Sequence, residues 1–370
     1  MTSVFLVLIF VFSGIFVFAF VAGAVVFAQM FSRKEDDGSL NPQVIKNSLS
    51  QMRQAKPGMQ LEGVKMQGFG EHLSSHVNDP RIMVPLLEAK LRWFDRLETT
   101  SDVEKITIHG TYGKKLVGYY VKPYPQKEDM EKNGSGCVAL LVHGYTDSAA
   151  GMAYLTEEYI KLGFSVFAVD CRTHGSSEGN AITLGFTESK DIVLWVKEIV
   201  QRLGDVKIVL HGVSMGAAAV VQSLVQKKMR PYAAKIVLAV ADCSFSSAKE
   251  QMSNQARVML GDSLFQRIVA AIVLWGMSLV NFFVCGFFIG QNSPKKALKK
   301  KKTCATAQTP LLLFHGKKDA FVPVGMAVCL EKTAGKTATL LLVDEAPHIG
   351  SYFYAPNLYM KTISDLIGLQ

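Results

Sequence analysis

The chain has 370 residues, of which 49% are hydrophobic and 19% are charged, and its formal net charge is +9. This length suits one large α/β domain with additional segments, and the high apolar content points to membrane segments. The positive charge would suit nucleic acid or an anionic membrane. We predict no nucleic-acid partner, because no basic motif with interleaved aromatic residues occurs and much of the excess charge lies in one lysine run.

The first 32 residues contain no charged side chain, and residues 4–31 are mainly Val, Phe, Ile, Leu and Ala. About 20 such residues cross the hydrocarbon core of a bilayer as a helix. The alternative is a cleaved secretory signal, with small residues at 22–24 as the cleavage site. A basic n-region is missing, however, and the apolar stretch is longer than a usual h-region. We therefore predict an uncleaved, single-pass transmembrane anchor over residues 1–32.

Basic residues follow this span directly, at Arg33 and Lys34, whereas nothing basic precedes it except the α-amine. The positive-inside rule therefore favours a cytoplasmic catalytic domain.

Residues 33–60 are polar and contain Gly38, Pro42 and Pro57, which is typical of a linker with some helix. Residues 80–98 repeat apolar side chains near the helical period, and Pro80 could begin that helix. We treat 33–99 as a linker and N-terminal helical segment. The alternation over 105–122 then predicts a β-hairpin.

From this point, short apolar runs alternate with helical patterns, which favours an α/β fold with a mostly parallel, eight-stranded sheet and helices on both faces. Nearly continuous Val, Leu and Ile are typical of strands buried on both sides. We expect this domain to occupy residues 100–370. The runs lie at 137–142, 164–169, 206–210, 236–241, 310–314 and 339–343, and the helical patterns at 148–162, 186–203, 215–228, 324–333 and 356–367.

In such sheets, ligands bind beyond the carboxyl ends of the strands. The run at 206–210 leads to GVSMG at 212–216, a G-x-S-x-G motif between a strand and a helix-forming segment. The serine of this motif occupies a sharp, strained turn, where a side chain at Gly212 or Gly216 would collide with neighbouring backbone. We predict that Ser214 is a nucleophile.

The run at 137–142 leads to HGYTD, which begins with His143 and Gly144. A serine hydrolase needs two backbone N–H donors where the oxyanion forms. One should come from Met215, which follows the nucleophile, and the other from Tyr145 in this loop. The alternative is an ordinary strand-to-helix loop.

Two later loops supply a candidate acid and base, Asp319 in HGKKD and His348 in EAPH. The order Ser214, Asp319, His348 is the order expected with this serine motif. His348 would take the proton from Ser214, and Asp319 would hold its tautomer. Asp242 also ends a strand and is the alternative acid, but D-x-x-V-P at Asp319 is better suited to begin the next helix.

The segment 170–179, DCRTHGSSEG, follows another strand, and we interpret Asp170 as a structural hydrogen-bonding residue near the site. The six cysteines form no C-x-x-C pair, and no histidine and carboxylate cluster has metal-ligand spacing. We therefore predict neither a metal nor a cofactor. Four other histidines do not occupy the place along the chain that is expected for the base: His72, His76, His109 and His174.

These motifs resemble the α/β-hydrolase superfamily, and in particular a membrane-anchored bacterial branch grouped with serine aminopeptidase-like, S33-type hydrolases. The resemblance rests on 143–148, 170–179, 212–216, 315–323 and His348, and covers about residues 100–367. It implies the fold and the triad. It does not imply a substrate, because related enzymes cleave esters, thioesters and peptides alike.

A second uncharged apolar stretch, residues 268–294, is also long enough to cross a membrane. A single crossing there would put Ser214 and Asp319 on opposite sides, so we predict a helical lid over about 246–303 instead. Six lysines follow between Lys295 and Lys302. Apolar surface beside this run could dock on anionic lipid; the alternative is a buried cap helix followed by a solvated lysine loop.

Together these features predict a membrane-anchored serine hydrolase that cleaves an ester, thioester or amide in a small-molecule, acyl or peptidyl substrate through an acyl-enzyme. One alternative is an acyltransferase on the same fold. Another is a non-catalytic binding protein, but a binding protein has no need of all three of Ser214, Asp319 and His348.

Overall fold

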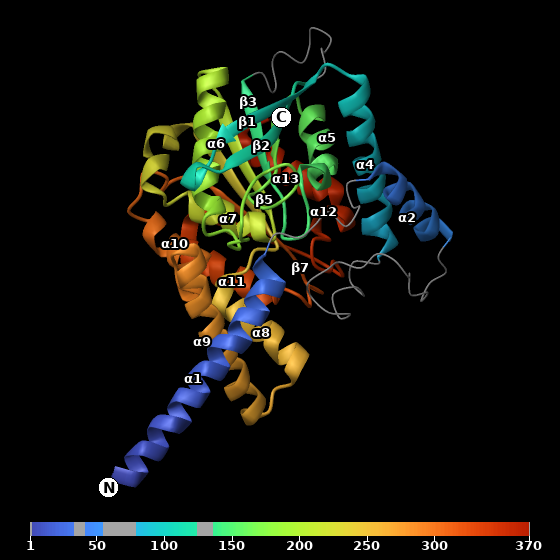
Figure 1. Cartoon of the computed structure of the whole chain (residues 1–370). Helices are drawn as coiled ribbons and strands as arrows, with labels where there is room; N and C mark the ends of the chain where they lie inside the picture. Colours follow the sequence, from blue (N-terminus) through green and yellow to red (C-terminus); the bar gives the residue numbers. More distant parts are fainter. Residues whose placement is uncertain (1, 33–40, 55–78, 124–135, 370) are drawn as a thin grey trace.

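The computed structural model describes residues 2–32, 41–54, 79–123 and 136–369 (Figure 1). Its centre is an eight-stranded sheet of order β1-β2-β4-β3-β5-β6-β7-β8. β1 pairs antiparallel with β2 and β2 antiparallel with β4, whereas the remaining pairs are parallel. The α/β class and the mostly parallel sheet are thus confirmed. The strands are β1 Val103–His109, β2 Lys115–Val121, β3 Cys137–Val142, β4 Ser165–Val169, β5 Lys207–Val213, β6 Ile236–Asp242, β7 Leu311–Gly316 and β8 Ala338–Val343.

Helices cover both faces of the sheet, as predicted, and alternate strand residues pack into two separate hydrophobic clusters. Leu140 lies in one cluster with Trp195 of α6, whereas its neighbour Leu141 lies in the other with Tyr159 of α5. This alternation follows from the two-residue period of a strand. The covering helices are α5 Ala153–Lys161, α6 Glu188–Leu203, α7 Met215–Ser223, α11 Val324–Ala334, α12 Ser351–Tyr354 and α13 Pro356–Ile367.

The helix predicted at 215–228 is shorter in the structure, because α7 ends at Ser223. The Ser223 hydroxyl donates to the carbonyl of Val220 and so competes with the backbone for that acceptor. A 3-10 segment, η3 Lys227–Lys235, follows. Similarly, the pattern at 148–162 becomes the 3-10 turn η2, Ala149–Met152, and then α5.

Two N-terminal helices, α2 Pro42–Gln54 and α4 Pro80–Thr99, lie on the α5 side of the sheet (Figure 1). Asp79 caps α4 by accepting a hydrogen bond from the Arg81 N–H at 2.9 Å. Pro80 occupies the first turn, where its missing N–H costs nothing. The rest of the predicted linker, 33–40 and 55–78, lies outside the described residues, and so do Arg33 and Lys34.

α1, Thr2–Phe31, projects from the body of the molecule and crosses a hairpin formed by α8, Ala248–Leu260, and α9, Leu264–Cys285 (Figure 1). This α8–α9 hairpin lies between β6 and β7, where the sequence predicts a lid. By length and composition, the segment Ser13–Phe31 of α1 and the whole of α9 could each cross a membrane.

The lysine run forms a helix, α10 Pro294–Lys301, and not the loop that one alternative predicted, although Lys296, Lys299, Lys300 and Lys302 are exposed as that alternative expected. The Lys301 side chain is buried and donates to the carbonyls of Ala307 and Thr309, each at 2.9 Å. These carbonyls satisfy the ammonium group inside the protein, and Lys301 therefore cannot bind lipid as the sequence suggested.

Candidate active site

Ser214 occupies the sharp turn between β5 and α7, with φ of 54° and ψ of −110°. This strained conformation persists because the neighbouring glycines allow close packing. A Cβ on Gly212 would lie 2.2 Å from the Gly216 carbonyl oxygen, and one on Gly216 would lie 2.1 Å from that of Val142. The turn therefore requires both glycines of the motif.

The structure brings the three residues Ser214, His348 and Asp319 into one hydrogen-bonded chain. Ser214 Oγ lies 2.9 Å from His348 Nε2, and His348 Nδ1 lies 2.7 Å from Asp319 Oδ2. They come from the loops after β5, β8 and β7, at the carboxyl edge of the sheet. Ser214 and Asp319 are both buried. The arrangement allows the hydroxyl proton to move to the imidazole while the carboxylate holds the ring.

The Asp319 carboxylate is held in its charged form by several donors. Oδ1 accepts hydrogen bonds from the N–H groups of Phe321 at 2.9 Å and Val322 at 2.7 Å. His315 Nε2 lies 3.3 Å from Oδ2. Burial alone would raise the pKa of Asp319, but the two imidazoles and their hydrogen bonds outweigh burial, and the pKa lies well below its usual value.

Asp242, the alternative acid, has other partners. Its carboxylate accepts hydrogen bonds from the Ser351 hydroxyl at 2.7 Å and the Tyr359 hydroxyl at 3.1 Å. Its main-chain carbonyl accepts from the Ser214 N–H at 2.8 Å. Burial raises the pKa of Asp242. These contacts give Asp242 a structural place beneath the turn that carries Ser214.

The loop after β3 runs directly against Ser214, since a Cβ on Gly144 would lie 3.6 Å from the Ser214 Cβ. His143 fixes the start of this loop. Its Nε2 accepts from the Cys171 N–H at 2.9 Å, so Nδ1 carries the proton and donates to the Gly144 carbonyl at 2.6 Å. Burial lowers the pKa of His143 to about 3 and keeps the ring neutral.

The two predicted oxyanion donors follow residues that lie side by side, since Met215 follows Ser214 and Tyr145 follows Gly144. Met215 is the first residue of α7, so its N–H has no acceptor four residues earlier within the helix. The carbonyl of Tyr145 accepts a hydrogen bond from His174 Nε2 at 2.6 Å, and its hydroxyl donates to the carbonyl of Met30 in α1. The sequence excludes His174 as the base but does not reveal that it holds this loop.

Lys90 of α4 supports the same loop from the other side. Its ammonium group lies 2.9 Å from Asp147 Oδ1, and its side chain is 11% exposed. The Asp147 carboxyl group fills the space beside Gly151, where a Cβ would lie 1.8 Å from Oδ2. No sequence signal marks Lys90, because its partner is 57 positions away and no motif includes a lysine of α4.

Asp170 joins the loops after β3 and β4. Its Oδ1 accepts from the Ala149 N–H and its Oδ2 from the Ser176 N–H, both at 2.9 Å. Burial raises its pKa. Both carboxylate oxygens are thus occupied by backbone donors.

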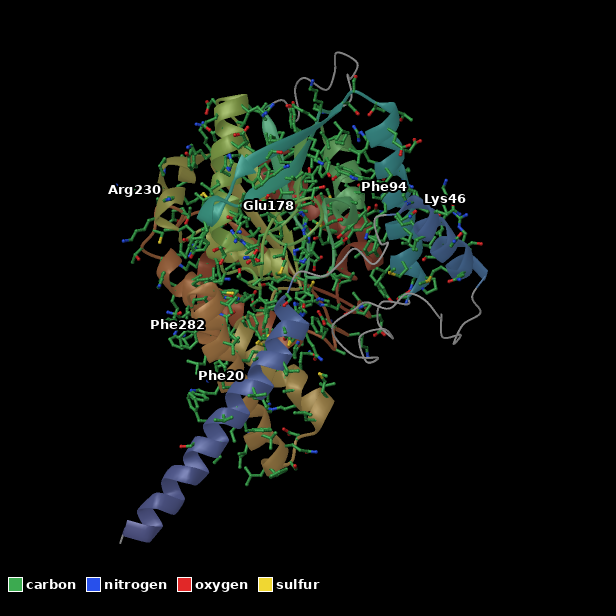
Figure 2. All side chains as sticks on the ribbon, viewed as in Figure 1. Phe20, Lys46, Phe94, Glu178, Arg230 and Phe282 are labelled. Carbon is green, nitrogen blue, oxygen red and sulfur yellow. The ribbon has the colours of Figure 1, made fainter. Side chains whose placement is uncertain are left out.

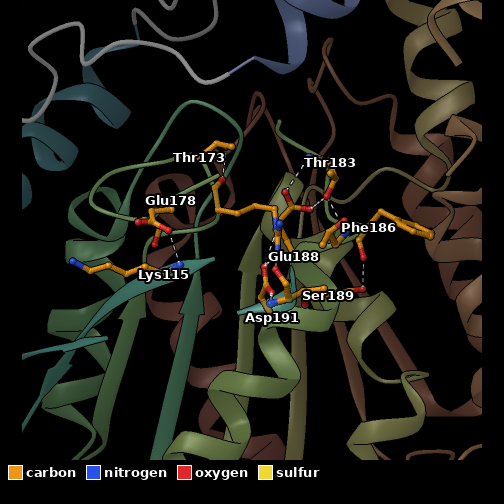
Figure 3. A network of polar contacts seen from close by, with 12 residues as sticks. Lys115, Thr173, Glu178, Thr183, Phe186, Glu188, Ser189 and Asp191 are labelled. Atoms are coloured by element: carbon orange, nitrogen blue, oxygen red, sulfur yellow. Dashed lines mark hydrogen bonds and ion pairs between the residues drawn. The ribbon is translucent and has the colours of Figure 1, made fainter. Parts of the chain in front are cut away.

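Residues 182–188, which follow the loop after β4, are held by a buried polar network (Figure 3). The Glu188 carboxylate accepts from the N–H groups of Thr183 at 3.0 Å and Gly185 at 2.9 Å. This segment receives the end of α1, because the Ile182 N–H donates to the Phe31 carbonyl at 2.7 Å. The network therefore connects the region of the site with the N-terminal helix.

Among the described residues, one group of potential metal ligands lies close together, with atoms of Cys243, Asp319 and His348 within 4.8 Å of one another. Asp319 and His348 are hydrogen-bonded to each other within this group. Cys243 directly follows β6, and burial raises the pKa of its thiol well above the ordinary value. The sequence does not predict this cysteine beside the triad.

The chain is similar to several known proteins. The model of the family described as serine aminopeptidase, S33, matches residues 136–271. The uncharacterized protein YqkD of Bacillus subtilis is 26% identical over 282 residues, which cover 74% of this chain and 81% of YqkD.

Among solved structures, an esterase of Pyrococcus furiosus has a TM-score of 0.53 at 19% identity, covering 72% of this chain and 90% of the esterase. An alpha-beta hydrolase of Vibrio vulnificus has a TM-score of 0.54 at 19% identity, covering 75% of this chain and 86% of that hydrolase. The chain thus has the fold of these hydrolases, and over residues 136–271 it resembles the S33 serine aminopeptidase family.

Proposed function

We propose that this protein is a serine hydrolase in which Ser214 is the nucleophile, His348 the general base and Asp319 the residue that orients His348. The observation that carries the proposal is the hydrogen-bonded chain of these three side chains on a strained turn at the carboxyl edge of the sheet. The superfamily supports hydrolysis in general, and the site supports a serine mechanism.

In this mechanism, Ser214 Oγ attacks the carbonyl carbon of the substrate as His348 Nε2 takes the hydroxyl proton. The N–H groups of Met215 and Tyr145 stabilise the oxyanion of the tetrahedral intermediate. His348 then gives its proton to the leaving group, and an acyl-enzyme remains. Water, activated by His348, attacks this ester and releases the acid, which restores Ser214. The substrate is an ester, thioester or amide; an acyltransferase would differ only in the final acceptor.

We also propose that α1 anchors the enzyme in a membrane, with the catalytic domain on the cytoplasmic side. Ile15, Val17 and Phe18 of α1 are exposed, which is unfavourable in water. Further along the helix, Phe27 and Phe31 are buried against the catalytic domain. A cleaved signal has no reason to contribute core residues to the mature protein, so this packing supports an anchor that is retained.

A fluorophosphonate probe tests the enzymatic proposal. The full chain in detergent or vesicles should be labelled, and Ser214→Ala should abolish labelling while the protein remains folded. Equal labelling of both proteins, or no labelling of the folded wild type, would contradict the proposal. A series of p-nitrophenyl esters of increasing acyl length, with peptide amides beside them, would then identify the bond that is cleaved.

A further inference from the structure

α1 and α9 touch at the level of their backbones. A Cβ on Gly276 of α9 would lie 1.8 Å from the Ala19 carbonyl oxygen, and one on Gly23 would lie 2.3 Å from the Met277 nitrogen. Ala19 and Gly23 are four residues apart, the spacing at which small residues let helices approach closely within membranes. Beside this crossing, the rings of Phe16 and Trp275 meet edge to face at 5.6 Å. The anchor is therefore packed tightly on the α8–α9 hairpin.

Despite this contact, the hairpin exposes large apolar side chains. Leu264 and Phe265 are each 75% exposed, Phe283 is 71% exposed and Trp275 is 52% exposed. Figure 2 shows Phe20 on α1 and Phe282 on α9 at the same end of the molecule. Exposed apolar side chains of this size are unfavourable in water and mark a docking surface.

The length of α1 indicates which part of the bilayer this surface meets. Its 30 residues span about 45 Å, whereas the hydrocarbon core is about 30 Å thick and needs about 20 residues. Phe27 and Phe31 are buried in the catalytic domain, so the part of α1 that lies in hydrocarbon comes before them. Gly23 precedes Phe27 by about one helical turn, and the crossing with Gly276 therefore lies toward the domain side of that part. Tryptophan is favoured at the boundary of the hydrocarbon, and Trp275 is the neighbour of Gly276.

The hairpin suits this boundary better than a membrane crossing. It starts and returns at the same place, because the Ala248 N–H donates at 3.0 Å to the carbonyl of Asn292, seven residues after the end of α9. Its far end carries charges, with Arg257 3.5 Å and Arg267 3.9 Å from Asp262. Charged groups at a helix end are expensive in hydrocarbon but are accommodated among lipid headgroups.

We infer that the α8–α9 hairpin lies in the headgroup and upper acyl region of the bilayer that α1 crosses, and that α1 and the hairpin form one membrane-docking unit. This inference rests on the proposed membrane anchor. The unit reaches the candidate site, since Met30 and Phe31 at the end of α1 accept hydrogen bonds from Tyr145 and Ile182. Docking would therefore fix the orientation of the Ser214 region relative to the lipid surface.

Tryptophan fluorescence tests this position, because Trp93 and Trp195 are buried whereas Trp275 is exposed. The full chain is reconstituted in phosphatidylcholine vesicles with or without lipid brominated at shallow acyl positions. We expect bromolipid to quench the wild type, and Trp275→Phe to remove the quenchable emission.

Unquenched emission that is sensitive to aqueous iodide would place Trp275 in water and overturn the inference. Emission that neither agent quenches, from a protein that elutes as a dimer in detergent, would place a second copy on this surface and would also overturn it.

Two variant pairs sharpen the test. Gly23→Leu should separate α9 from α1 and change the quenching of Trp275, whereas Gly14→Leu, on the same helix with open space around it, should not. Unchanged quenching in the folded Gly23→Leu protein would show that the two parts do not form one unit.

Phe283→Glu should lose most of the quenching. Leu358→Glu alters an apolar residue that is 50% exposed on α13 and should retain it. Equal quenching in these two proteins would show that the exposed apolar side chains of the hairpin do not hold it in lipid. Fluorophosphonate labelling of the same samples reports on Ser214 independently, so failure of the catalytic proposal would be recognised separately.

Discussion

The hydroxyl of Tyr145 donates a hydrogen bond to the main-chain carbonyl of Met30, which ties the loop beside Ser214 to the last turn of α1. The carbonyl of Tyr145 accepts at the same time from His174. Burial raises the pKa of Tyr145, so its hydroxyl keeps the proton that it donates. One residue thus connects the N-terminal helix with the peptide group expected to stabilise the oxyanion.

Tyr145→Phe removes this connection but leaves the backbone N–H in place. A neutral hydrogen bond contributes about 1 kcal/mol, so we expect kcat for an ester substrate to fall roughly fivefold, while fluorophosphonate still labels Ser214. Tyr112→Phe, at a residue that is 70% exposed, is the matched control. A loss as complete as that in Ser214→Ala would show instead that the Tyr145 side chain takes part in the chemistry.

The strands and the candidate triad could be predicted because their signals are local. Buried parallel strands require continuous apolar runs, and the turn at Ser214 requires glycines at 212 and 216, whatever the rest of the chain does. The order of Ser214, Asp319 and His348 along the chain then follows from the topology of the sheet. The choice of Asp319 over Asp242 depended on one short motif, and the structure gives Asp242 other partners.

The contacts that hold the site together could not be predicted, because they join distant segments. Nothing near Lys90 in the sequence indicates Asp147, and nothing in α1 indicates that Met30 meets Tyr145. The prediction that the lysine run is solvated was wrong for Lys301, and the reason is related. The composition of the run suggests a solvated loop, but the carbonyls that satisfy Lys301 come from a later turn of the chain.

The two candidate acids can be separated by mutation. Asp319→Asn should lower kcat about 10³–10⁴-fold with little change in KM, because the amide no longer holds the required imidazole tautomer. Asp242→Asn should mainly lower stability, by about 1–3 kcal/mol, because it disturbs the buried hydrogen bonds from Ser351 and Tyr359. Steady-state kinetics and thermal unfolding measure the two effects, and the reverse pattern would assign the acid to Asp242.

The ion pair between Lys90 and Asp147 should support the loop that follows β3. Lys90→Met is expected to lower stability by about 1–2 kcal/mol, since it leaves the Asp147 carboxylate unpaired, and to lower kcat as the loop loses its support. Arg92→Met removes a neighbouring but more exposed pair with Glu157 and should cost about 0–1 kcal/mol with unchanged kcat. If both variants behave alike, α4 does not position this loop.

His211 should make stability depend on pH. Its ring nitrogens lie 3.0 Å from the Tyr159 hydroxyl and 2.9 Å from the Tyr359 hydroxyl, and burial lowers its pKa to about 3. Between pH 6.5 and 3, the unfolded chain binds a proton at this position and the folded protein does not. Its contribution to stability is therefore complete above about pH 6.5 and is lost at about 1.4 kcal/mol per pH unit as the pH falls.

His211→Gln cannot take up this proton. The variant should be less stable than the wild type at pH 7.5, because the glutamine fills the site poorly, but the difference should narrow as the pH falls toward 5. Thermal unfolding of both proteins in detergent at pH 7.5, 6.5 and 5.5 measures the effect. His143, whose pKa is lowered in the same way, contributes equally to both proteins and cancels in the comparison. Parallel curves would mean that His211 becomes protonated in the folded state, which would require its two tyrosine contacts to open in acid.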